Sequence, residues 1–369
     1  MDQVLFWLPI KTNWTPDGIP IYGFGTMLFV VFVVTTWLAG YRAEKYALPG
    51  ADAATRKSLA ERVRDVVLWT FIGGIVGARI FYLVQYRDRI QNPLTEFFQI
   101  WNGGIVFYGS AIGGLVAALL ARRFLLKPFN ISGWQLADTL APSIAIGLAI
   151  GRIGCFLNGC CWGHPACPDC VQVHFPMMTS PAREMLYRLQ TSAGFAMDPR
   201  ASDERTVGAI EPGSAAAKAG VKPGDVIIAV DGHPIVDAND LHRAFSPDHW
   251  PRGKKDLTLT IRRGSDEITL PTFTPRTIGL FPTQIYETIS MLLIFVILVL
   301  LYPHRQYDGQ VMVMLMLCYA IHRYFNELLR YDTPTYFLGL TASQEISILI
   351  FSAGVALALY RRRFPLARP

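Results

Sequence analysis

Five of the six cysteines of this 369-residue chain lie between Cys155 and Cys170, directly after the segment Gly151-Arg152-Ile153-Gly154. That segment ends a long apolar run, so Arg152 is expected inside a membrane span. An arginine in such a place is energetically costly and indicates a functional site by default. Thiols beside a glycine-rich stretch with an asparagine, at the membrane surface, favour a site for the charged headgroup of a lipid.

Other charged side chains also lie on apolar segments. Tyr319, Arg323 and Glu327 are spaced by four residues and share one face of a helix. An ion pair between Arg323 and Glu327 would have a structural role. However, four arginines compete there for two glutamates: Arg79, Arg152, Arg323 and Arg330 against Glu287 and Glu327. Surplus guanidinium groups need an anion, and the planar fork of arginine suits a phosphate, of which a phospholipid headgroup is the most available source.

The elements that must position these residues are seven apolar blocks of membrane length. The chain is 51% hydrophobic with a mean hydropathy of +0.30, which argues against a large soluble helical protein. The first and sixth blocks are the clearest by hydropathy, and the glycine-rich second, third and fourth are expected to pack inside a bundle. The blocks cover residues 19–41, 63–85, 104–126, 133–158, 279–302, 309–329 and 343–361.

Lysines and arginines predict the orientation of the blocks, because basic loops remain in the cytoplasm. The basic residues are concentrated in the loops that follow the first, third, fifth and seventh blocks. They are Arg42, Lys45, Arg56, Lys57, Arg62, Arg64, Arg122, Arg123, Lys127, Arg305, Arg361, Arg362 and Arg363. We therefore expect a bacterial inner-membrane protein with a periplasmic N-terminus and a cytoplasmic C-terminus. The net charge of +6 is then a topology signal and not a nucleic-acid footprint. No removable signal peptide is expected over residues 1–18.

The residues between the fourth and fifth blocks have the composition of a soluble domain. Strands are predicted at 207–210, 226–230, 257–262 and 267–270, with helices at 215–219 and 238–245. Together with the segment Pro212-Gly213-Ser214-Ala215-Ala216-Ala217-Lys218-Ala219-Gly220-Val221-Lys222-Pro223-Gly224-Asp225, this order resembles a PDZ domain of the bacterial periplasmic protease type. Such domains bind extended peptides at a sheet edge, although a spacer or packing role is an alternative.

These observations predict an all-α polytopic membrane protein of seven transmembrane helices, with an inserted periplasmic α+β PDZ-like domain. Residues 1–163 and 277–369 would form the membrane domain, with spans 1–4 and 5–7 respectively. Residues 164–200 would form a cysteine-containing periplasmic loop, and residues 201–276 the PDZ-like domain.

The polar motifs of the spans occur in a characteristic order. They are Tyr22-Gly23, the Arg79 segment, Asp138 with Pro142, Gly151-Arg152-x-Gly154-x-Phe156-x-Asn158-Gly159 with Gly163, Pro282-Thr283-Gln284-x-Tyr286-Glu287, Tyr319-x-x-x-Arg323-x-x-x-Glu327-x-x-Arg330 and Gln344-x-x-Ser347. This set, over about two thirds of the chain, resembles bacterial phosphatidylglycerol–prolipoprotein diacylglyceryl transferases. The resemblance implies transfer of the sn-1,2-diacylglyceryl group from phosphatidylglycerol to a lipobox cysteine thiol, with release of glycerol 1-phosphate.

The resemblance also implies roles for individual residues. Arg152 and Arg323 would stabilise charge on the leaving phosphate, and a base must take the thiol proton. The expected catalytic residues are Arg152, Arg323, Tyr22 and Tyr108. The expected substrate-binding residues are Arg79, Asn158, Gly163, Tyr286, Glu287, Tyr319, Glu327, Arg330 and Gln344. Expected partners are phosphatidylglycerol or a related anionic phospholipid, a prolipoprotein signal peptide and a peptide ligand of the PDZ-like domain, without nucleic acid. No metal or other cofactor is expected.

Three positions depart from the pattern of that family. It usually has His, Asn and Glu where this chain has Tyr108, Cys155 and Cys160. A phenol ordinarily has a pKa near 10 and is a poor base at neutral pH, and cysteine lacks the hydrogen-bonding capacity of an amide. The alternative is a catalytically altered relative that acts as a phospholipid-binding scaffold protein.

The clustered cysteines suggest further possibilities. In an oxidising compartment they should form disulfides, with Cys160 or Cys161 joined to Cys167 or Cys170. A zinc site using these four thiols or His164 is an alternative, as is a redox-active pair, which would make the chain a membrane thiol–disulfide protein. Cys318, within the sixth block, is expected to serve packing.

Overall fold

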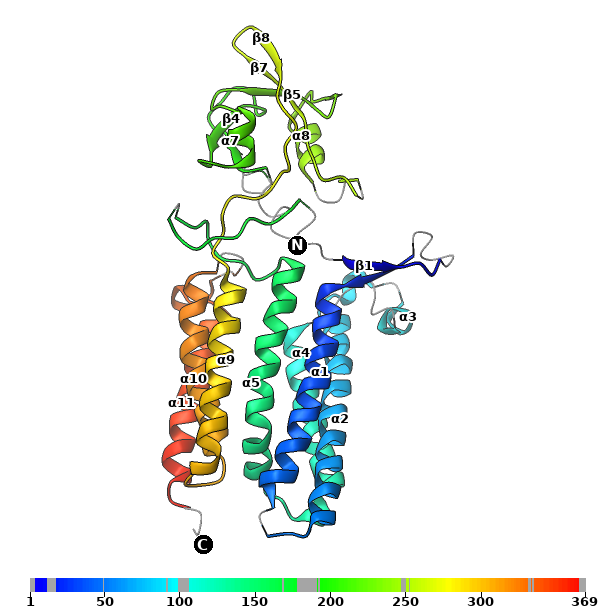
Figure 1. Ribbon diagram of the computed structural model, residues 1–369, viewed down its shortest axis with the longest axis vertical. Coiled ribbons are helices and arrows are strands. Elements are labelled where there is room, and N and C mark those ends of the chain that lie inside the picture. Colours follow the sequence, from blue (N-terminus) through cyan, green and yellow to red (C-terminus); the bar gives the residue numbers. More distant parts are fainter. Residues whose placement is uncertain are drawn as a thin grey trace. The chain divides into compact units, whose positions relative to one another are not determined.

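The computed structural model describes residues 4–11, 18–48, 50–90, 92–98, 106–167, 169–177, 191, 193–246, 250–251, 253–330, 333 and 335–364 (Figure 1). The chain forms two compact units. One comprises Met1–Met27, Gly151–Thr288 and Arg323–Glu345, and the other comprises Leu28–Ile150, Ile289–His322 and Ile346–Pro369. Several long helices contribute residues to both units. Polar residues at one end of a helix can therefore belong to one unit, while apolar residues along the rest of the helix pack in the other.

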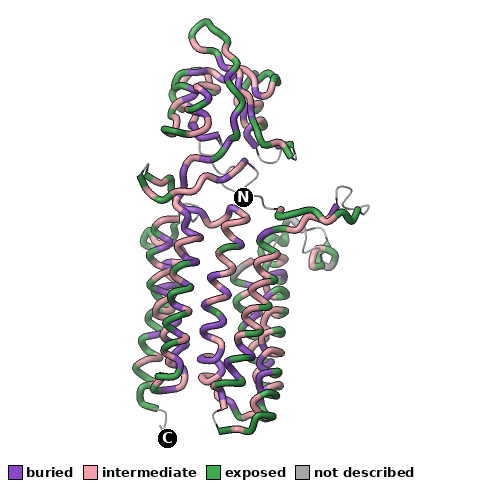
Figure 2. The backbone as a smooth tube through the Cα atoms, in the orientation of Figure 1, coloured by how far each residue is buried: buried purple, intermediate pink, exposed green. Residues whose placement is uncertain are grey.

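Six of the described helices are long and apolar enough to cross a membrane. They are α1 (Gly23–Arg42, continued by a π-helical turn over Ala43–Ala47), α2 (Ala53–Gln85), α4 (Phe107–Leu125), α5 (Gly133–Asn158), α9 (Thr283–Leu301) and α11 (Ala342–Arg361). Many residues of these helices are exposed, as the green stretches of the backbone in Figure 2 show. The exposed apolar residues include Trp37, Phe124 and Leu349. Extensive apolar exposure along such helices is typical of surfaces that face lipid, and it indicates a multi-pass membrane protein.

The expected sixth span forms the helix α10 (Gln310–Leu328), but this helix is not among the six. Its last two turns carry His322, Arg323, Asn326 and Glu327, and these polar residues offset its apolar first half. The prediction that this block would be one of the clearest by hydropathy was therefore wrong. The residues that lower its hydropathy are the ones that matter for the site.

Glycines allow α2 and α4 to pack closely. Gly73 and Gly77 lie four residues apart on α2, as do Gly109 and Gly113 on α4. A Cβ atom added at Gly77 would lie 2.3 Å from the carbonyl oxygen of Gly109, and one at Gly113 would lie 2.3 Å from that of Gly73. Small residues at this spacing let helix backbones approach within a membrane, which accounts for the glycine content of these two blocks.

Asp138, which belongs to the family-like pattern, caps another helix. Its side chain, on α5, is fully buried. Its carboxylate accepts hydrogen bonds from the backbone N–H groups of Gly309, Val311 and Met312 at 2.8, 2.9 and 3.0 Å. These amides begin α10, where unpaired N–H groups and the helix dipole favour an anion. Asp138 therefore has a structural role at the start of α10.

The inserted segment forms a small α+β fold. Its strands β6 (His233–Pro234), β5 (Val226–Val230), β7 (Leu259–Arg263) and β8 (Asp266–Thr269) make an antiparallel sheet in that order. A second pair consists of β3 (Phe195–Met197) and β4 (Val207–Ile210). The helices are α7 (Ala215–Ala219) and α8 (Ala238–Phe245). The sequence predicted β4, α7, β5 and α8 with these bounds.

Local capping explains that agreement at α7. The Ser214 hydroxyl accepts a hydrogen bond from the N–H of Ala217 at 3.1 Å, and Gly220 ends the helix with φ at 98°. An N-cap serine and a left-handed C-terminal glycine are strong helix boundary signals.

The hydrophobic core of the insert begins before residue 201. Phe195 on β3 is 1% exposed, and its ring packs edge-on against that of Phe245 with centroids 5.8 Å apart. Ala193 and Met197 belong to the same cluster. A domain that starts at 201 would lack this strand.

Candidate functional site

Five charged side chains gather where α5, α9 and α10 contribute to the same compact unit. Nε of Arg152 lies 2.9 Å from Oε1 of Glu287, whose Oε2 lies 3.6 Å from Nη1 of Arg323. Nη2 of Arg323 lies 2.7 Å from Oε2 of Glu327, which is also 3.8 Å from Nη1 of Arg330. We call these five residues the arginine–glutamate cluster. It contains three guanidinium groups and two carboxylates.

The cluster is largely shielded from solvent. The side chains of Glu287 and Glu327 are at most 1% exposed, those of Arg323 and Arg330 are 9% exposed, and that of Arg152 is 17% exposed. Nη1 of Arg323 is buried and has no hydrogen-bond partner among the described residues. Nη1 lies near the Glu287 carboxylate without a hydrogen bond to it, and a buried guanidinium with such a donor is suited to bind an anion such as phosphate.

Neighbouring polar groups hold the two carboxylates. Asn326 donates a hydrogen bond from Nδ2 to Oε2 of Glu287 at 3.2 Å, and Thr341 donates from Oγ1 to Oε1 of Glu327 at 3.0 Å. Nη2 of Arg323 also donates to the Ser343 hydroxyl at 2.8 Å. Asn326, Thr341 and Ser343 are not among the site residues expected from the sequence. An amide three residues after Arg323 on the same helix was the available signal for Asn326.

Gln344 acts as a cap of α11. Its Oε1 accepts from the N–H of Thr341 at 3.0 Å, and its own N–H donates to the Thr341 hydroxyl at 3.3 Å. This reciprocal pair is a capping box. Gln344 therefore orients Thr341 toward Glu327, and its expected role in substrate binding stays a prediction.

The loop after α5 is held against α9. Gly159 and Cys161 have φ angles of 71° and 61°, in the left-handed region that is unusual for cysteine. The Gln284 side chain donates to the carbonyl of Cys160 at 2.7 Å, and the Thr283 hydroxyl donates to that of Cys161 at 2.6 Å. The strained conformation of Cys161 is thus fixed by contacts from the first turn of α9.

Gly163 is required for close packing. It pairs as a β-bridge with Arg330, and its N–H donates to the carbonyl of Phe281 at 3.0 Å. A Cβ atom at Gly163 would lie 2.7 Å from Cβ of Phe281 and 2.8 Å from the carbonyl oxygen of Leu329. The absence of a side chain therefore lets the loop after α5 reach the backbone beside Arg330.

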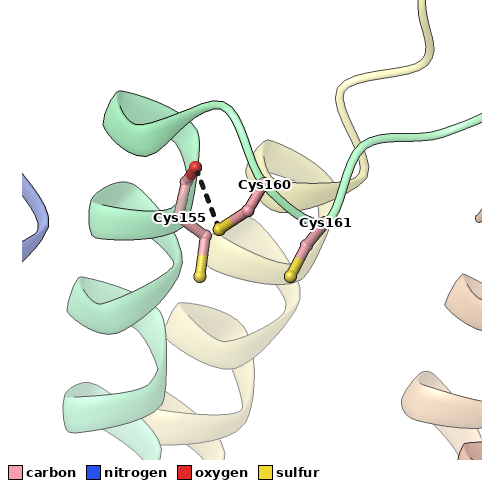
Figure 3. A group of neighbouring side chains, drawn as sticks. All are labelled: Cys155, Cys160 and Cys161. Carbon is pink, nitrogen blue, oxygen red and sulfur yellow. Dashed lines mark hydrogen bonds between the residues drawn. The ribbon is translucent and has the colours of Figure 1, made fainter. Parts of the chain in front are cut away.

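Three thiols lie together at this loop (Figure 3). Cys155 comes from the last turns of α5, and Cys160 and Cys161 come from the loop that follows. Their sulfur atoms all lie within 4.8 Å of one another, and each residue is partly exposed. Nη1 of Arg152 lies 3.9 Å from Sγ of Cys155. Within the described parts of the chain, this is the one group of three or more metal-ligating side chain types at such distances.

The neighbours of Cys160 and Cys161 shift their acidities in opposite directions. Hydrogen bonds from the Cys155 and Cys160 thiols lower the pKa of Cys161 well below its usual range, and the charges of Arg330 and Arg152 act in the same direction against burial. The Cys155 thiol lowers the pKa of Cys160, but the contact with Cys161 and burial outweigh it and raise the pKa to about 11. The neighbours of Cys161 therefore favour its ionisation, whereas those of Cys160 oppose it.

The expected disulfide pairing was wrong. Cys167 is joined to Cys170, with their Cα atoms 5.1 Å apart, whereas Cys160 and Cys161 are free thiols. The carbonyls of Cys160 and Cys161 are held by α9, and their sulfurs gather with Cys155 instead. The disulfide also takes Cys167 and Cys170 out of the zinc site that the sequence suggested as an alternative. Cys318, on α10, contacts Sδ of Met314 with its sulfur at 3.7 Å.

Other expected site residues have different surroundings. Tyr22 ends strand β2 (Ile19–Tyr22), which pairs with β1 (Val4–Leu8), and it is 53% exposed. The Tyr286 hydroxyl lies 3.5 Å from the carbonyl of Val171, which is at the limit of a hydrogen bond. Asn158 is the last residue of α5.

Three more of the expected residues belong to the other compact unit. Arg79 is buried and donates to the backbone carbonyls of Glu96 and Phe97 from the short helix α3 (Pro93–Phe98). Tyr108 is 48% exposed near the start of α4, and Tyr319 packs against an apolar cluster that includes Leu315. Their expected catalytic and binding roles stay predictions.

Comparison with known proteins identifies a matching family. Residues 13–360 match the family described as prolipoprotein diacylglyceryl transferase. A protein of Rhodopirellula baltica named phosphatidylglycerol–prolipoprotein diacylglyceryl transferase is 28% identical, over 96% of this chain and 75% of its own length. One of the same name from Enterococcus faecalis is 25% identical, over 94% of this chain and 89% of its own length. One from Listeria monocytogenes is 41% identical over 29% of this chain and 38% of its own length.

Proposed function

Because this chain belongs to the prolipoprotein diacylglyceryl transferase family, we propose that its arginine–glutamate cluster is the place where the transferred group leaves its phosphate. The activity of the chain is transfer of the diacylglyceryl group from phosphatidylglycerol to a prolipoprotein. The observation that carries the placement is the buried Nη1 of Arg323, which has no hydrogen-bond partner among the described residues, beside Arg152 and Arg330. That donor is available to a phosphate oxygen.

The reaction requires charge stabilisation at the leaving group. The acceptor sulfur forms a bond to a glyceryl carbon, the bond between that carbon and the phosphate oxygen breaks, and glycerol 1-phosphate leaves. Negative charge develops on the leaving phosphate, and the guanidinium groups of Arg152 and Arg323 stabilise it. Removal of one preorganised donor at such a position typically costs roughly 10²–10³-fold in rate.

The glutamates of the cluster position the arginines. Glu287 contacts both Arg152 and Arg323, and Glu327 contacts both Arg323 and Arg330. Each carboxylate therefore holds two guanidinium groups in one orientation before the lipid binds, which lowers the reorganisation needed in the transition state.

We further assign seven crossings of the bacterial inner membrane, with α10 as the sixth. The polar residues that lower the hydropathy of α10 have partners, because Arg323 pairs with Glu327 and Asn326 with Glu287. Paired polar groups that face a bundle interior are tolerated in a membrane span. The arginine-rich loops then lie in the cytoplasm, and the insert lies in the periplasm.

The insert is suited to bind the protein substrate in the manner of a PDZ domain. A pocket of about 320 Å³ is lined by residues of β3 and β4 and by the segment that leads to α9, including Phe195, Ala196, Ile210 and Glu211. An extended peptide could pair with β3 and place a side chain in this pocket. Ala196→Trp should then raise the KM for the lipobox peptide without changing lipid binding. An unchanged KM would leave the insert with a packing role.

A transfer assay tests the function. Protein in detergent is mixed with radiolabelled phosphatidylglycerol and a lipobox peptide, and Arg323→Ala is compared with Arg243→Ala, an exposed arginine of the insert. Label on the peptide cysteine that is lost only in Arg323→Ala supports the proposal. Saturable lipid binding without transfer would favour a phospholipid-binding scaffold protein. An activity that follows thiol oxidation and ignores Arg323 would favour a thiol–disulfide protein.

A further inference from the structure

The reaction proposed for the arginine–glutamate cluster does not use the thiols of Cys155, Cys160 and Cys161. We propose that they bind one zinc ion, whose fourth position receives the cysteine thiol of the prolipoprotein and activates it. This inference rests on the proposed function for the identity of the fourth ligand, while the three-thiolate site itself stands on geometry.

The distances suit a single small ion. The three sulfurs lie within 4.8 Å of one another. Zinc binds thiolate at about 2.3 Å, so two sulfurs on one tetrahedral ion are about 3.8 Å apart. The sulfur–sulfur distances therefore need to shorten by about 1 Å or less for all three thiols to bind the same ion. Two of the ligands are on the loop that α9 holds in place, and the third is on the end of α5 (Figure 3).

The surrounding charge suits a thiolate-bound divalent ion. Three thiolates around Zn²⁺ carry one net negative charge. Nη1 of Arg152 lies 3.9 Å from Sγ of Cys155, and Arg330 pairs as a β-bridge with Gly163, two residues after Cys161. The guanidinium group of Arg152 therefore offsets part of the negative charge at its distance from the thiolates.

The group has three ligands, which is the composition of a zinc site that keeps one position open. In the described parts of the chain, no His, Asp or Glu joins these three cysteines within the same distances. Zinc sites with three protein ligands keep the fourth position for water or substrate, whereas closed structural sites use four. The partial exposure of all three cysteines allows a ligand from outside to reach that position.

The open position removes the need for a separate strong base. A thiol that coordinates a zinc ion loses its proton outright, and here the proton passes to solvent when the prolipoprotein cysteine binds. The resulting thiolate then forms its bond to the glyceryl carbon as the phosphate leaves. No electron is transferred, and the ion stays on its three protein ligands.

Metal binding is measured on the full-length protein in detergent, with its free thiols reduced and metal removed by chelation. On titration with zinc, elemental analysis should find one ion per chain in the wild type. The same result is expected for Cys318→Ser, a control thiol on α10, and for the Cys167→Ser/Cys170→Ser double variant. Cys161→Ser removes a ligand and should weaken binding by at least the roughly 10–100-fold that loss of a group supporting a ligand costs. Absence of zinc from the reduced wild type, or full binding by the Cys155→Ser/Cys160→Ser/Cys161→Ser variant, would overturn the site.

The fourth ligand is tested by spectroscopy. Cobalt in place of zinc should give thiolate charge-transfer bands that change when a lipobox peptide is added, and a peptide with serine in place of its cysteine should leave them unchanged. Identical spectra with both peptides would overturn the assigned fourth ligand.

A transfer assay separates this inference from the proposed function. Chelation should abolish transfer and zinc should restore it. Transfer that persists after complete metal removal contradicts the zinc activation and leaves the family reaction intact. Zinc that binds as expected in a protein without any transfer contradicts the proposed function and leaves the metal site intact.

Discussion

Nε of Arg152 lies 2.9 Å from Oε1 of Glu287, and the other oxygen of this carboxylate lies 3.6 Å from Nη1 of Arg323. One carboxylate from α9 therefore couples an arginine of α5 to an arginine of α10. Because the Glu287 side chain is 1% exposed, the pairing has to offset a large desolvation cost. Such an arrangement is costly to keep without a use, and recognition of the leaving phosphate by the two guanidinium groups is the use that we propose.

Arg323→Lys should lower kcat for diacylglyceryl transfer by roughly 10²–10³-fold, because lysine keeps the charge but loses the planar fork. The KM for phosphatidylglycerol should change less than kcat if the fork acts mainly on the leaving phosphate. Steady-state kinetics with labelled lipid provide the measurement, and Arg243→Lys on the exposed face of α8 is the matched control. A lysine variant with wild-type kcat would show that positive charge alone suffices.

Glu287→Gln should destabilise the protein by about 3–5 kcal/mol, because it leaves buried guanidinium groups without their carboxylate. The hydrogen bond from Asn326 can persist, so the loss reports the charge and not the shape. Thermal unfolding in detergent measures the effect, with Glu267→Gln on the exposed strand β8 as a control. Equal melting temperatures of the two variants would contradict the structural importance of the cluster.

Gly163→Ala should cost about 1–3 kcal/mol, the usual range for overpacking. Its new methyl group would meet Phe281 and the backbone of Leu329 at distances below 3 Å. Gly25→Ala on α1 is a suitable comparison, because its Cβ would meet nothing within 4 Å. Chemical or thermal unfolding of both variants distinguishes close packing from a general effect of replacing glycine, and an undisturbed Gly163→Ala protein would refute the packing role.

The insert should fold cooperatively as a fragment of residues 193–276 and be much less stable as 201–276. The shorter fragment loses β3 and with it the buried contact between Phe195 and Phe245. Loss of a buried phenylalanine typically costs about 3–5 kcal/mol. Urea unfolding followed by circular dichroism compares the two fragments, and equal midpoints would place β3 outside the functional fold of the insert.

The fragment 193–276 should also lose stability at low pH through Asp203. A hydrogen-bonded ion pair with Arg205 lowers the pKa of Asp203 to about 2 in the folded insert, below the value of about 4 for an unfolded chain. Its contribution is therefore fully present above about pH 4 and is lost as the pH falls toward 2. Urea midpoints across this range should fall more steeply for the wild type than for Asp203→Asn. Parallel curves would show that the pair does not contribute.

The amino-acid sequence by itself determined the features that depend on neighbouring residues along the chain. The apolar blocks predicted the membrane helices, and the caps at Ser214 and Gly220 predicted the bounds of α7, because both signals act within one or two turns. The surplus of arginines over glutamates was also visible from composition on apolar segments. The excess of arginines over glutamates on these segments favoured an anion-binding site before any distance between the side chains was known.

Only the tertiary structure decided which of these residues meet. Glu287 contacts arginines that are far apart in sequence, Cys160 and Cys161 gather with Cys155 and not with Cys167 or Cys170, and Asp138 caps α10. Such pairings depend on how helices pack and on the contacts by which α9 holds the loop after α5, and no local pattern encodes them. The polar residues of α10 show the same limit. They lower its hydropathy when counted alone, and Arg323 and Glu327 pair within the helix, but the contacts of Arg323 and Asn326 with Glu287 on α9 appear only in the folded structure.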